Sequence, residues 1–246
     1  MYALSLPCCM KLLDGIEIVD LALYLRKQRT LIVGDVHIGF EEALNKQGVL
    51  VPRFHLSDVL ERLGAIFGKV GKVDTFAING DLKHEFGTIS EQEWRDTLKF
   101  IDFAAKHCNK VAIVKGNHDV ILGPVARKRG IEVVHHLVLG ENYLIHGDTI
   151  PDDADFKKAK NIIIGNEHPA VSVRYGARSE LFKCFLRGKW KGKNLIVMPS
   201  FNPLTIGSDV TREQMLSPFL KRGIMDFEAF IVADKIYDFG KLRNLK

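Results

Sequence analysis

The sequence has little cysteine, no long apolar run and no strong excess of charge of one sign. Its four cysteines form no CxxC pair, which favours a reducing, cytoplasmic setting over a disulfide-stapled secreted fold. No apolar run approaches the ~20 residues that a membrane helix requires, so we expect no membrane partner. The net charge of +5 is compatible with a phosphate-rich partner but does not identify one.

The composition suits one globular unit. With 46% hydrophobic residues in a chain of 246, there is enough apolar surface for a substantial core, and no linker or fixed-period repeat divides the chain. We therefore expect a single domain over residues 1–246. The opening stretch, MYALSLPCCMKLL, lacks the basic region of a secretion signal and is interpreted as a first strand.

Short apolar runs rich in β-branched residues recur along the chain, and each stops at glycine or proline next to polar residues. Runs bounded in this way are typical of strands that are buried on both faces. They occur at residues 30–37, 75–84, 110–119, 142–148, 161–168 and 194–203. Helical patterns follow the first three runs, at 52–70, at 90–107 with the capping pair Ser90 and Glu93, and more weakly at 123–130.

The second half of the chain leaves little room for helices. Two hairpins are indicated there, one with its tip at residues 188–192 and one that turns near 233–235. Alternating strands and helices followed by strands alone predict an α/β fold with α+β character. We expect two mixed β-sheets that pack face to face and are flanked by helices.

Polar side chains that can bind metals follow five of the apolar runs. Ligands bind beyond the carboxyl ends of strands in open α/β sheets, so these side chains are expected at one edge. Singly, each has an ordinary explanation as a turn residue or a hydrogen-bonded histidine, but burying the whole set is costly unless cations or hydrogen bonds compensate. The candidates are Asp35, His37, Asp81, His84, Asn117, His118, Asp119, His146, Asp148, Asn166 and His168.

The order of these motifs resembles that of the calcineurin-like metallophosphoesterases. The motifs are D-x-H at 35–37, G-D at 80–81, G-N-H-D at 116–119, H-G at 146–147 and G-x-x-H at 165–168. The stretches LIVGDVHIGFEEAL and NGDLKHEF are also similar to a branch of small archaeal and bacterial phosphoesterases related to the Mre11/SbcD nucleases. The resemblance implies the β-sandwich of that superfamily and a hydrolase acting on phosphoester bonds.

The resemblance also implies two divalent metal ions that share a bridging hydroxide. The first ion would be held by Asp35, His37, Asp81 and His168, and the second by Asp81, Asn117 and His146. Carboxylate, imidazole and amide donors suit Mn²⁺, with Fe, Zn²⁺ and Ni²⁺ as alternatives. Such a pair clamps an in-line displacement and lowers the pKa of the attacking water.

Several further residues receive roles from the resemblance, each with a plain alternative. His118, beside Asn117, would stabilise the phosphoryl group or act as a general acid. Asp119 would orient His118 or cap a helix. His84 would line the pocket or make a structural hydrogen bond, and Asp148 would support a ligand or occupy a turn.

The fifth motif departs from the family pattern, which is G-H-x-H. Asn166 stands where the first histidine is expected, and a neutral amide is a weaker donor than imidazole. Three hypotheses follow. The second ion is held loosely, Glu167 compensates, or activity is so reduced that the protein is a metal-binding module. Strand alternation argues against Glu167, because it would point that side chain away from the site.

Basic residues concentrate between residues 174 and 193, where seven lysines and arginines accompany one acid, and Tyr175 and Trp190 lie among them. Arg174 and Arg178 are candidate substrate contacts, because such a hairpin could grip a DNA or RNA backbone. The alternative is a solvated hairpin tip. The leading hypothesis is a metal-dependent phosphoesterase, either a phosphodiesterase or a nuclease, that acts in DNA processing. The alternatives are a small-molecule phosphatase or phosphodiesterase and a catalytically weak binding module.

Overall fold

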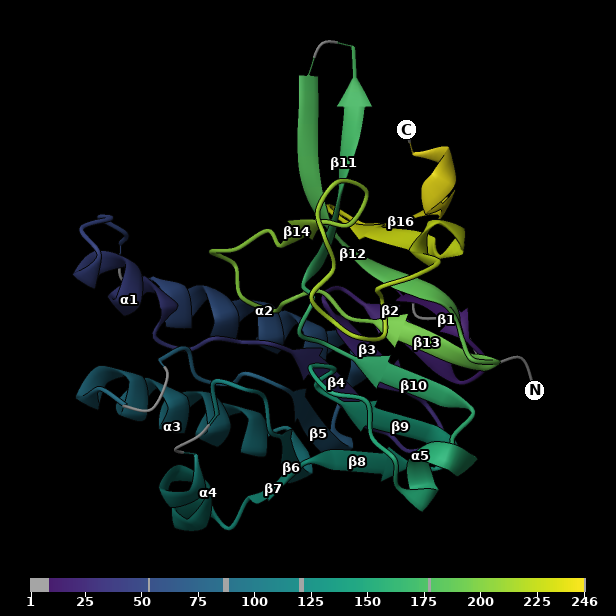
Figure 1. Cartoon of the computed structure of the whole chain (residues 1–246). Helices are drawn as coiled ribbons and strands as arrows, with labels where there is room; N and C mark the ends of the chain where they lie inside the picture. Colours follow the sequence, from purple (N-terminus) through teal and green to yellow (C-terminus); the bar gives the residue numbers. More distant parts are fainter. Residues whose placement is uncertain (1–8, 53, 86–88, 120–121, 177, 246) are drawn as a thin grey trace.

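Two β-sheets pack face to face, and helices cover the outer side of the first sheet (Figure 1). The structure is a computed structural model that describes residues 9–52, 54–85, 89–119, 122–176 and 178–245. The predicted first strand begins within this part as β1, and residues 1–8 of that stretch lie outside the described residues. The predicted fold class, two packed mixed sheets flanked by helices, is confirmed.

The first sheet changes from antiparallel to parallel at its fourth strand. Its strands lie in sequence order: β1 (Cys9–Leu13), β2 (Ile16–Val19), β3 (Ala22–Leu25), β4 (Thr30–Gly34), β5 (Val73–Asn79), β6 (Cys108–Val114) and β7 (Glu132–Val134). Neighbours are antiparallel up to β4 and parallel from β4 to β7. The carboxyl ends of β4, β5 and β6 therefore meet at one edge.

The helices of this half connect the parallel strands. They are α1 (Phe40–Lys46), α2 (His55–Val70), α3 (Glu91–Ala105) and α4 (Gly123–Arg129). The predicted cap of α3 is confirmed, because the Ser90 side chain accepts a hydrogen bond from the backbone amide of Glu93. Helix α1 follows the first ligand motif directly and was not predicted, because its seven residues are too short to show periodicity.

The second sheet runs β14-β11-β12-β13-β10-β9-β8, and β15 and β16 extend it from β12. The strands are β8 (His136–Leu139), β9 (Asn142–Ile145), β10 (Asn161–Ile164), β11 (Pro169–Tyr175), β12 (Arg178–Trp190), β13 (Lys193–Val197), β14 (Ser208–Asp209), β15 (Glu228–Val232) and β16 (Ile236–Lys241). The remaining helices are α5 (Ala154–Lys158) and the 3₁₀ turns η1 (Ile224–Asp226) and η2 (Leu242–Asn244). Both predicted hairpins are present, as β12–β13 and β15–β16.

Side-chain amides link the amino ends of three parallel strands in this sheet. Asn161 stands opposite Asn142 of β9 and Asn194 of β13. The Asn161 amide nitrogen donates to the Asn142 side-chain oxygen at 2.7 Å, and Asn194 donates to the Asn161 oxygen at 2.6 Å. The three strands therefore start level with one another, and β9 and β10 run parallel from this line.

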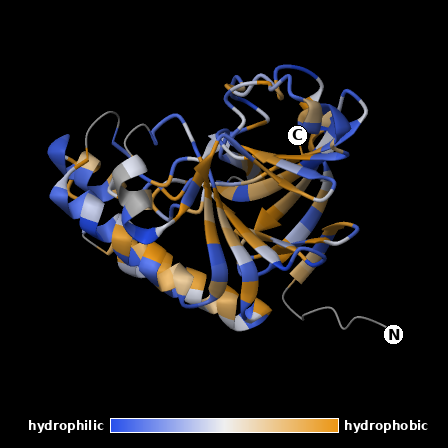
Figure 2. Cartoon of the chain, turned by 90° about the horizontal axis from the view of Figure 1, so that it is seen from below, coloured by the Kyte–Doolittle hydropathy of each residue, from blue (hydrophilic) through white to orange (hydrophobic). Residues whose placement is uncertain are grey.

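The main apolar core lies between the two sheets. It joins Ile32 and Ile78 of the first sheet to Ile163, Phe185 and Ile196 of the second. Figure 2 shows apolar residues along the strands and on the helix faces turned toward the sheet, while loops are mostly hydrophilic. This burial of apolar surface holds the two sheets together. No helix in the described ranges is long and apolar enough to cross a membrane.

Candidate metal centre

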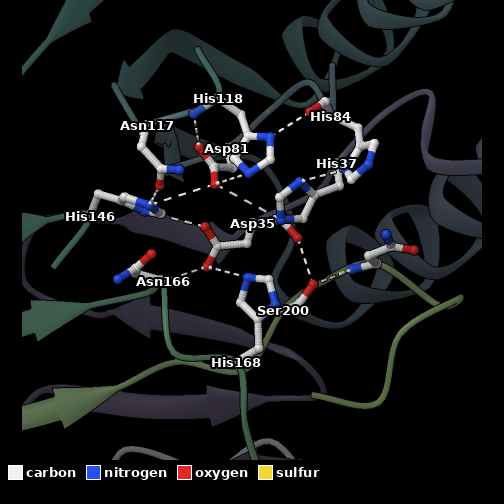
Figure 3. A network of polar contacts seen from close by, with 12 residues as sticks. Asp35, His37, Asp81, His84, Asn117, His118, His146, Asn166, His168 and Ser200 are labelled. Carbon is white, nitrogen blue, oxygen red and sulfur yellow. Dashed lines mark hydrogen bonds and ion pairs between the residues drawn. The ribbon is translucent and has the colours of Figure 1, made fainter. Parts of the chain in front are cut away.

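Five strand ends from both sheets bring polar side chains to one place (Figure 3). The first sheet contributes residues that follow β4, β5 and β6, and the second contributes residues that follow β9 and β10. These residues are Asp35, His37, Asp81, Asn117, His118, His146, Asn166 and His168. The structure therefore brings these five segments together, as the sequence predicted.

Among the described residues, four groups of ligand atoms are close enough to surround an ion, and two of these groups share Asp35. In one, ligand atoms of Asp35, His37 and His168 lie within 4.8 Å of one another. In the other, Asp35, Asp81 and His146 meet the same condition. The Asp35 carboxylate is fully buried, with Nε2 of His168 3.5 Å from one oxygen and Nδ1 of His146 3.3 Å from the other.

Asp81 faces both groups. Its Oδ2 lies 4.0 Å from Nε2 of His37 and 3.6 Å from Nε2 of His146. Its Oδ1 accepts a hydrogen bond from the backbone amide of His118 at 2.8 Å, which fixes the orientation of the carboxylate. Asn117 stands beside this group, with its Oδ1 2.9 Å from Nε2 of His146. Asp81 is thus placed where a carboxylate could serve two ions.

Two buried polar atoms of the cluster lack good hydrogen-bond partners within the described part of the chain and could bind a cation instead. Asp35 Oδ1 and His146 Nδ1 are both buried, and among the residues that the structure describes neither atom has a hydrogen bond of good geometry. Buried polar atoms are normally satisfied, so two such atoms facing each other indicate a missing partner between them. Oxygen and imidazole nitrogen donors at this spacing suit Mn²⁺, Fe or Zn²⁺.

Asn166 reaches the cluster through its backbone, whose amide donates to Asp35 Oδ2 at 3.0 Å. The neighbouring Glu167 is turned away, as strand alternation predicted. Its buried carboxylate accepts hydrogen bonds from the backbone amides of Leu216 and Ser217. Compensation of Asn166 by Glu167 is therefore wrong, because that carboxylate already ties down another loop.

Backbone strain concentrates at the candidate ligands. Non-glycine residues rarely adopt positive φ, and when they do they cluster at functional sites. Asp35, His37, Asn166 and His168 have φ of 41°, 50°, 58° and 48°. They are four of the seven described non-glycine residues with positive φ; the others are Asp20, Arg29 and Lys191. The two ligand-bearing strands, β4 and β10, thus end in the same unusual conformation.

Glycines leave room for the ligand side chains at two of the strand ends. A Cβ on Gly80 would lie 1.9 Å from Nδ1 of His146, and one on Gly116 would lie 2.1 Å from Oδ1 of Asp81. Gly80 also has φ of 88°, which a side chain disfavours. The glycines in the G-D and G-N-H-D motifs are therefore required by close approach as well as by turn geometry.

The electrostatics of the cluster follow from burial among opposite charges. Burial raises the pKa of Asp35, but the charges of His146 and His168 outweigh it and leave that pKa far below its ordinary value. Burial, together with the negative charge of Asp35, raises the pKa of Asp81 to about 6. Burial lowers the pKa of His146, but Asp35 reverses this and raises it to about 9. Burial lowers the pKa of His37 well below its usual range.

His118 and His84 stand together on the other side of Asp81 from Asn166 (Figure 3). The Nδ1 atom of His118 lies 2.5 Å from the backbone oxygen of His84, and the two rings stack with centroids 5.5 Å apart. His118 Nε2 lies 3.8 Å from Asp81 Oδ2, so that nitrogen faces the cluster. His84 Nδ1 lies 3.5 Å from Nδ1 of His37, which favours the pocket-lining interpretation of His84.

Asp119 has a different role from the two that the sequence suggested. Its buried carboxylate accepts hydrogen bonds from the backbone amides of Leu82, Lys83 and Gly116. The Nδ1 atom of His118 is instead held by a backbone oxygen. Burial and the charge of Asp81 raise the pKa of Asp119 to about 6. Asp119 joins the two ligand-bearing turns after β5 and β6.

The basic segment does not form one surface. Arg174 and Arg178 are exposed at the far end of the β11–β12 hairpin, which projects from the body of the molecule (Figure 1). Trp190 packs against Phe219, with ring centroids 5.0 Å apart. At ~3.3 Å per residue, Arg174 stands roughly 20 Å along β11 from His168. At this distance Arg174 lies too far from the cluster to touch a phosphate bound there, and its role as a substrate contact stays a prediction.

The sixth apolar run supports the centre without supplying a ligand. The Ser200 hydroxyl donates to the backbone oxygen of Asp35 at 2.7 Å. Nearby backbone bonds run from Phe201 to Gly34 and from Met198 to Ile164. This segment thus ties the ends of β4 and β10 together. The signal was present in the sequence, since the run at 194–203 ended in polar residues like the others.

Polar and charged side chains from other elements bind the segment at residues 200–202. Lys183 on β12 points inward, and its Nζ donates to the backbone oxygens of Ser200 at 2.7 Å and Asn202 at 2.5 Å. The Asn202 side-chain oxygen lies 2.9 Å from Nε2 of His55, whose Nδ1 lies 2.9 Å from a carboxylate oxygen of Glu41. Sequence reasoning missed these residues, because they come from separate elements and share no motif.

Comparisons with known proteins identify the family of the chain. No curated protein matches the chain. Among solved structures, the Vps29 double mutant from Entamoeba histolytica aligns with a TM-score of 0.35 and 14% identity over 86% of this chain and 99% of that chain. A predicted phosphoesterase from Streptococcus pneumoniae aligns with a TM-score of 0.31 and 16% identity over 83% of each chain. Residues 28–227 match the calcineurin-like phosphoesterase family, so the chain belongs to that family.

Proposed function

We propose that the protein is a metal-dependent phosphoesterase that hydrolyses phosphodiesters at a two-metal centre, and that residues 1–246 act as one domain. The observation that carries this proposal is the pair of ligand groups that share Asp35 and are joined by Asp81. Divalent ions bound there would polarise the phosphoryl oxygens and provide a nucleophilic hydroxide at neutral pH. Family membership supports the hydrolase class.

The proposed ligand roles follow the placement of the side chains. His37 and His168, with Asp35, would hold the first ion, and His146 with Asn117 would hold the second. Asp81 would serve both. His118 would bind the phosphoryl oxygen or protonate the leaving oxygen through Nε2, because its Nδ1 is already engaged with the His84 backbone.

We also propose that the protein is related to the Mre11/SbcD nucleases and acts on DNA or RNA. The projecting hairpin supports a polymeric substrate, because Arg174 and Arg178 could contact a backbone that extends well beyond the reacting phosphate. A small phosphomonoester would leave both arginines unused. The proposed setting is a reducing one, in keeping with Cys108 and Cys184, which are free thiols in the part of the chain that the structure describes.

A second candidate function rests on Asn166. With an amide in place of imidazole, and with Glu167 committed elsewhere, the second ion would be held by fewer strong donors. A protein in that condition could bind phosphate or nucleic acid through the first ion and turn over slowly. The two candidates differ in turnover and share metal binding.

Hydrolysis assays separate these possibilities. Mn²⁺-dependent turnover of bis-(p-nitrophenyl) phosphate would be compared with turnover of p-nitrophenyl phosphate and with cleavage of single- and double-stranded DNA. We expect preference for the diester together with DNA cleavage. Asp81→Ala is the control, because it removes the carboxylate that faces both groups and should abolish activity.

Each other outcome has a definite meaning. Hydrolysis of the monoester alone would remove the nuclease proposal. Metal and DNA binding without turnover would favour the binding module. A failure of both ligand groups to take up Mn²⁺ would overturn the proposed metal centre.

A further inference from the structure

A cavity of about 280 Å³ opens beside the metal centre, next to Asn117. Three segments form its walls: the turn after β6, the residue between β7 and β8, and the end of β9 with the loop that follows it. They contribute Lys115, Asn117, His135, Ile145, Asp148 and Thr149. The volume is just below the usual range for drug-sized ligands, so the cavity suits a group about the size of a phosphate and part of a sugar.

The cavity is continuous with the metal centre through shared residues. Asn117 lines the cavity and also contacts His146 within the cluster. Ile145, another wall residue, precedes His146 directly. Figure 3 shows Asn117 and His146 together on the side of the cluster opposite His84. A substrate with its scissile phosphate at the cluster would therefore extend into this cavity on that side.

Lys115 gives the cavity a positive charge that is free to bind a ligand. Within the described part of the chain its ammonium has no hydrogen bond or ion pair, whereas Lys110 on the preceding strand β6 pairs with Glu132 at 2.6 Å. The exposed side chains of His135 and Thr149 add hydrogen-bond donors. Asp148 adds a carboxylate, which repels an anion but accepts a hydrogen bond from a hydroxyl group.

We propose that this cavity is a subsite for a second phosphate, carried on the sugar next to the scissile phosphoester. Lys115 would neutralise that phosphate as a point charge, and Asp148 would limit how tightly it binds. The inference rests on the proposed phosphoesterase function and specifies its substrate class. That class is nucleotides and oligonucleotides with a phosphate on each side of one sugar.

Two chromogenic esters test the subsite. They are the p-nitrophenyl ester of thymidine 5′-monophosphate and the same ester carrying a 3′-phosphate. We expect wild type to prefer the 3′-phosphorylated ester, mainly through a lower KM. Lys115→Gln should reduce the ratio of the two kcat/KM values by about fivefold, the effect of losing one exposed charge contact. Asp148→Asn should change the ratio in the opposite direction.

Matched variants exclude a general structural effect. Lys115→Arg keeps the charge and should retain most of the preference. Lys106→Gln removes an exposed lysine at the end of α3, away from the cavity, and should leave the ratio unchanged. An unchanged ratio in both Lys115→Gln and Asp148→Asn would overturn the subsite while leaving the phosphoesterase function intact.

Calorimetric binding makes the test independent of turnover. Thymidine 3′,5′-bisphosphate and thymidine 5′-monophosphate would be titrated into the Mn²⁺-equilibrated protein. Tighter binding of the bisphosphate in wild type, lost in Lys115→Gln, supports the subsite even if neither ester is hydrolysed. Equal affinities in wild type would overturn it. Absence of hydrolysis of both esters would count against the proposed function alone.

Discussion

At the scale of single residues, the centre is built from conformations that the sequence alone does not reveal. Asp35, His37, Asn166 and His168 all adopt positive φ, at a cost of about 1–2 kcal/mol for each residue. Asparagine and histidine tolerate this region better than most residues, which is consistent with their presence here. The packing around β4 and β10 must therefore hold the ligands in place before any ion binds.

The first prediction concerns Asn166→His. An imidazole at this position should strengthen the second ion site by about tenfold or more and raise turnover, because imidazole is a stronger donor than an amide. The backbone already suits the change, since His168 occupies a similar conformation two residues away. Calorimetric Mn²⁺ titration and the rate of bis-(p-nitrophenyl) phosphate hydrolysis measure the two effects.

Asn166→Ala is the companion variant, because it removes the amide without adding a donor. It should weaken the second ion or leave only one ion bound. If Asn166→His changes neither stoichiometry nor rate, Asn166 does not lie beside an ion.

The candidate ligands could be recognised from sequence because their chemistry is local. Residues such as Asp81 and His146 follow apolar runs directly, so strand ends place them without further information. The role of Asp119 could not be recognised, because its three amide partners come from two turns 33 or more residues apart along the chain. The distance of Arg174 from the cluster could not be predicted, because the length and direction of a hairpin depend on tertiary contacts rather than on charge.

At the scale of elements, glycines at the strand ends set how closely neighbouring ligands approach. Gly80 follows β5, and its missing Cβ is where Nδ1 of His146 lies. The residue that follows β5 must therefore be glycine to leave room for a side chain from the other sheet. A glycine elsewhere need not carry this constraint: Gly68 in α2 has open space around its missing Cβ.

The second prediction compares these two glycines. Gly80→Ala should destabilise the protein by about 2–4 kcal/mol and abolish tight Mn²⁺ binding, because the new methyl group displaces His146 and occupies a positive-φ site. Gly68→Ala should stabilise it by about 0.5–1 kcal/mol, because alanine favours helix α2. Urea unfolding and metal titration of both variants check this. Normal Mn²⁺ affinity in Gly80→Ala would contradict the close approach to His146.

The third prediction concerns pH and Lys183 on β12. Burial, with a contribution from the charge of Arg62, lowers the pKa of Lys183 to about 7. The unfolded chain then binds more protons than the folded one between pH 7 and about 10.4, so this lysine makes stability rise with pH in that window. Below pH 7 both states are protonated and the cost of burying the charge is fully present.

Lys183→Met removes this dependence. The stability of the variant minus that of wild type, each as a free energy of unfolding, should be largest near pH 6–7. This difference should fall by at most ~1.4 kcal/mol per pH unit toward pH 10, because wild type gains stability over that range. Urea unfolding at three pH values measures the difference. Lys189→Met, at an exposed position on the same strand, is the matched control and should give a constant difference. A constant difference for Lys183→Met as well would contradict the prediction.

At the scale of the whole molecule, the two sheets share one centre. Asp35, His37 and Asp81 follow strands of the first sheet, while His146 and His168 follow strands of the second. The general architecture could be predicted from sequence, because buried strands and amphipathic helices have distinct periods. Strands β2 and β3 were not predicted, since their short runs end in ordinary turns without a ligand motif.

The fourth prediction follows from ligands contributed by both sheets. An ion that binds only the folded arrangement stabilises the whole chain, by about 2.7 kcal/mol at a hundredfold excess over its dissociation constant. For a chain of 246 residues this corresponds to a rise in Tm of roughly 5–10 °C. Differential scanning calorimetry with and without Mn²⁺ measures it. Asp81→Ala should show little rise; an equal rise in that variant would place the stabilising ion elsewhere.

The hydrogen-bonded asparagine side chains at the start of β9, β10 and β13 fix the register of these three strands relative to one another. His146 lies four residues beyond Asn142, Asn166 five beyond Asn161 and Ser200 six beyond Asn194. A slip of one residue in either pairing would turn every side chain of that strand to the opposite face. The pairing of these asparagines, at the end of the strands away from the metal centre, therefore fixes how far the residues after each strand extend toward it.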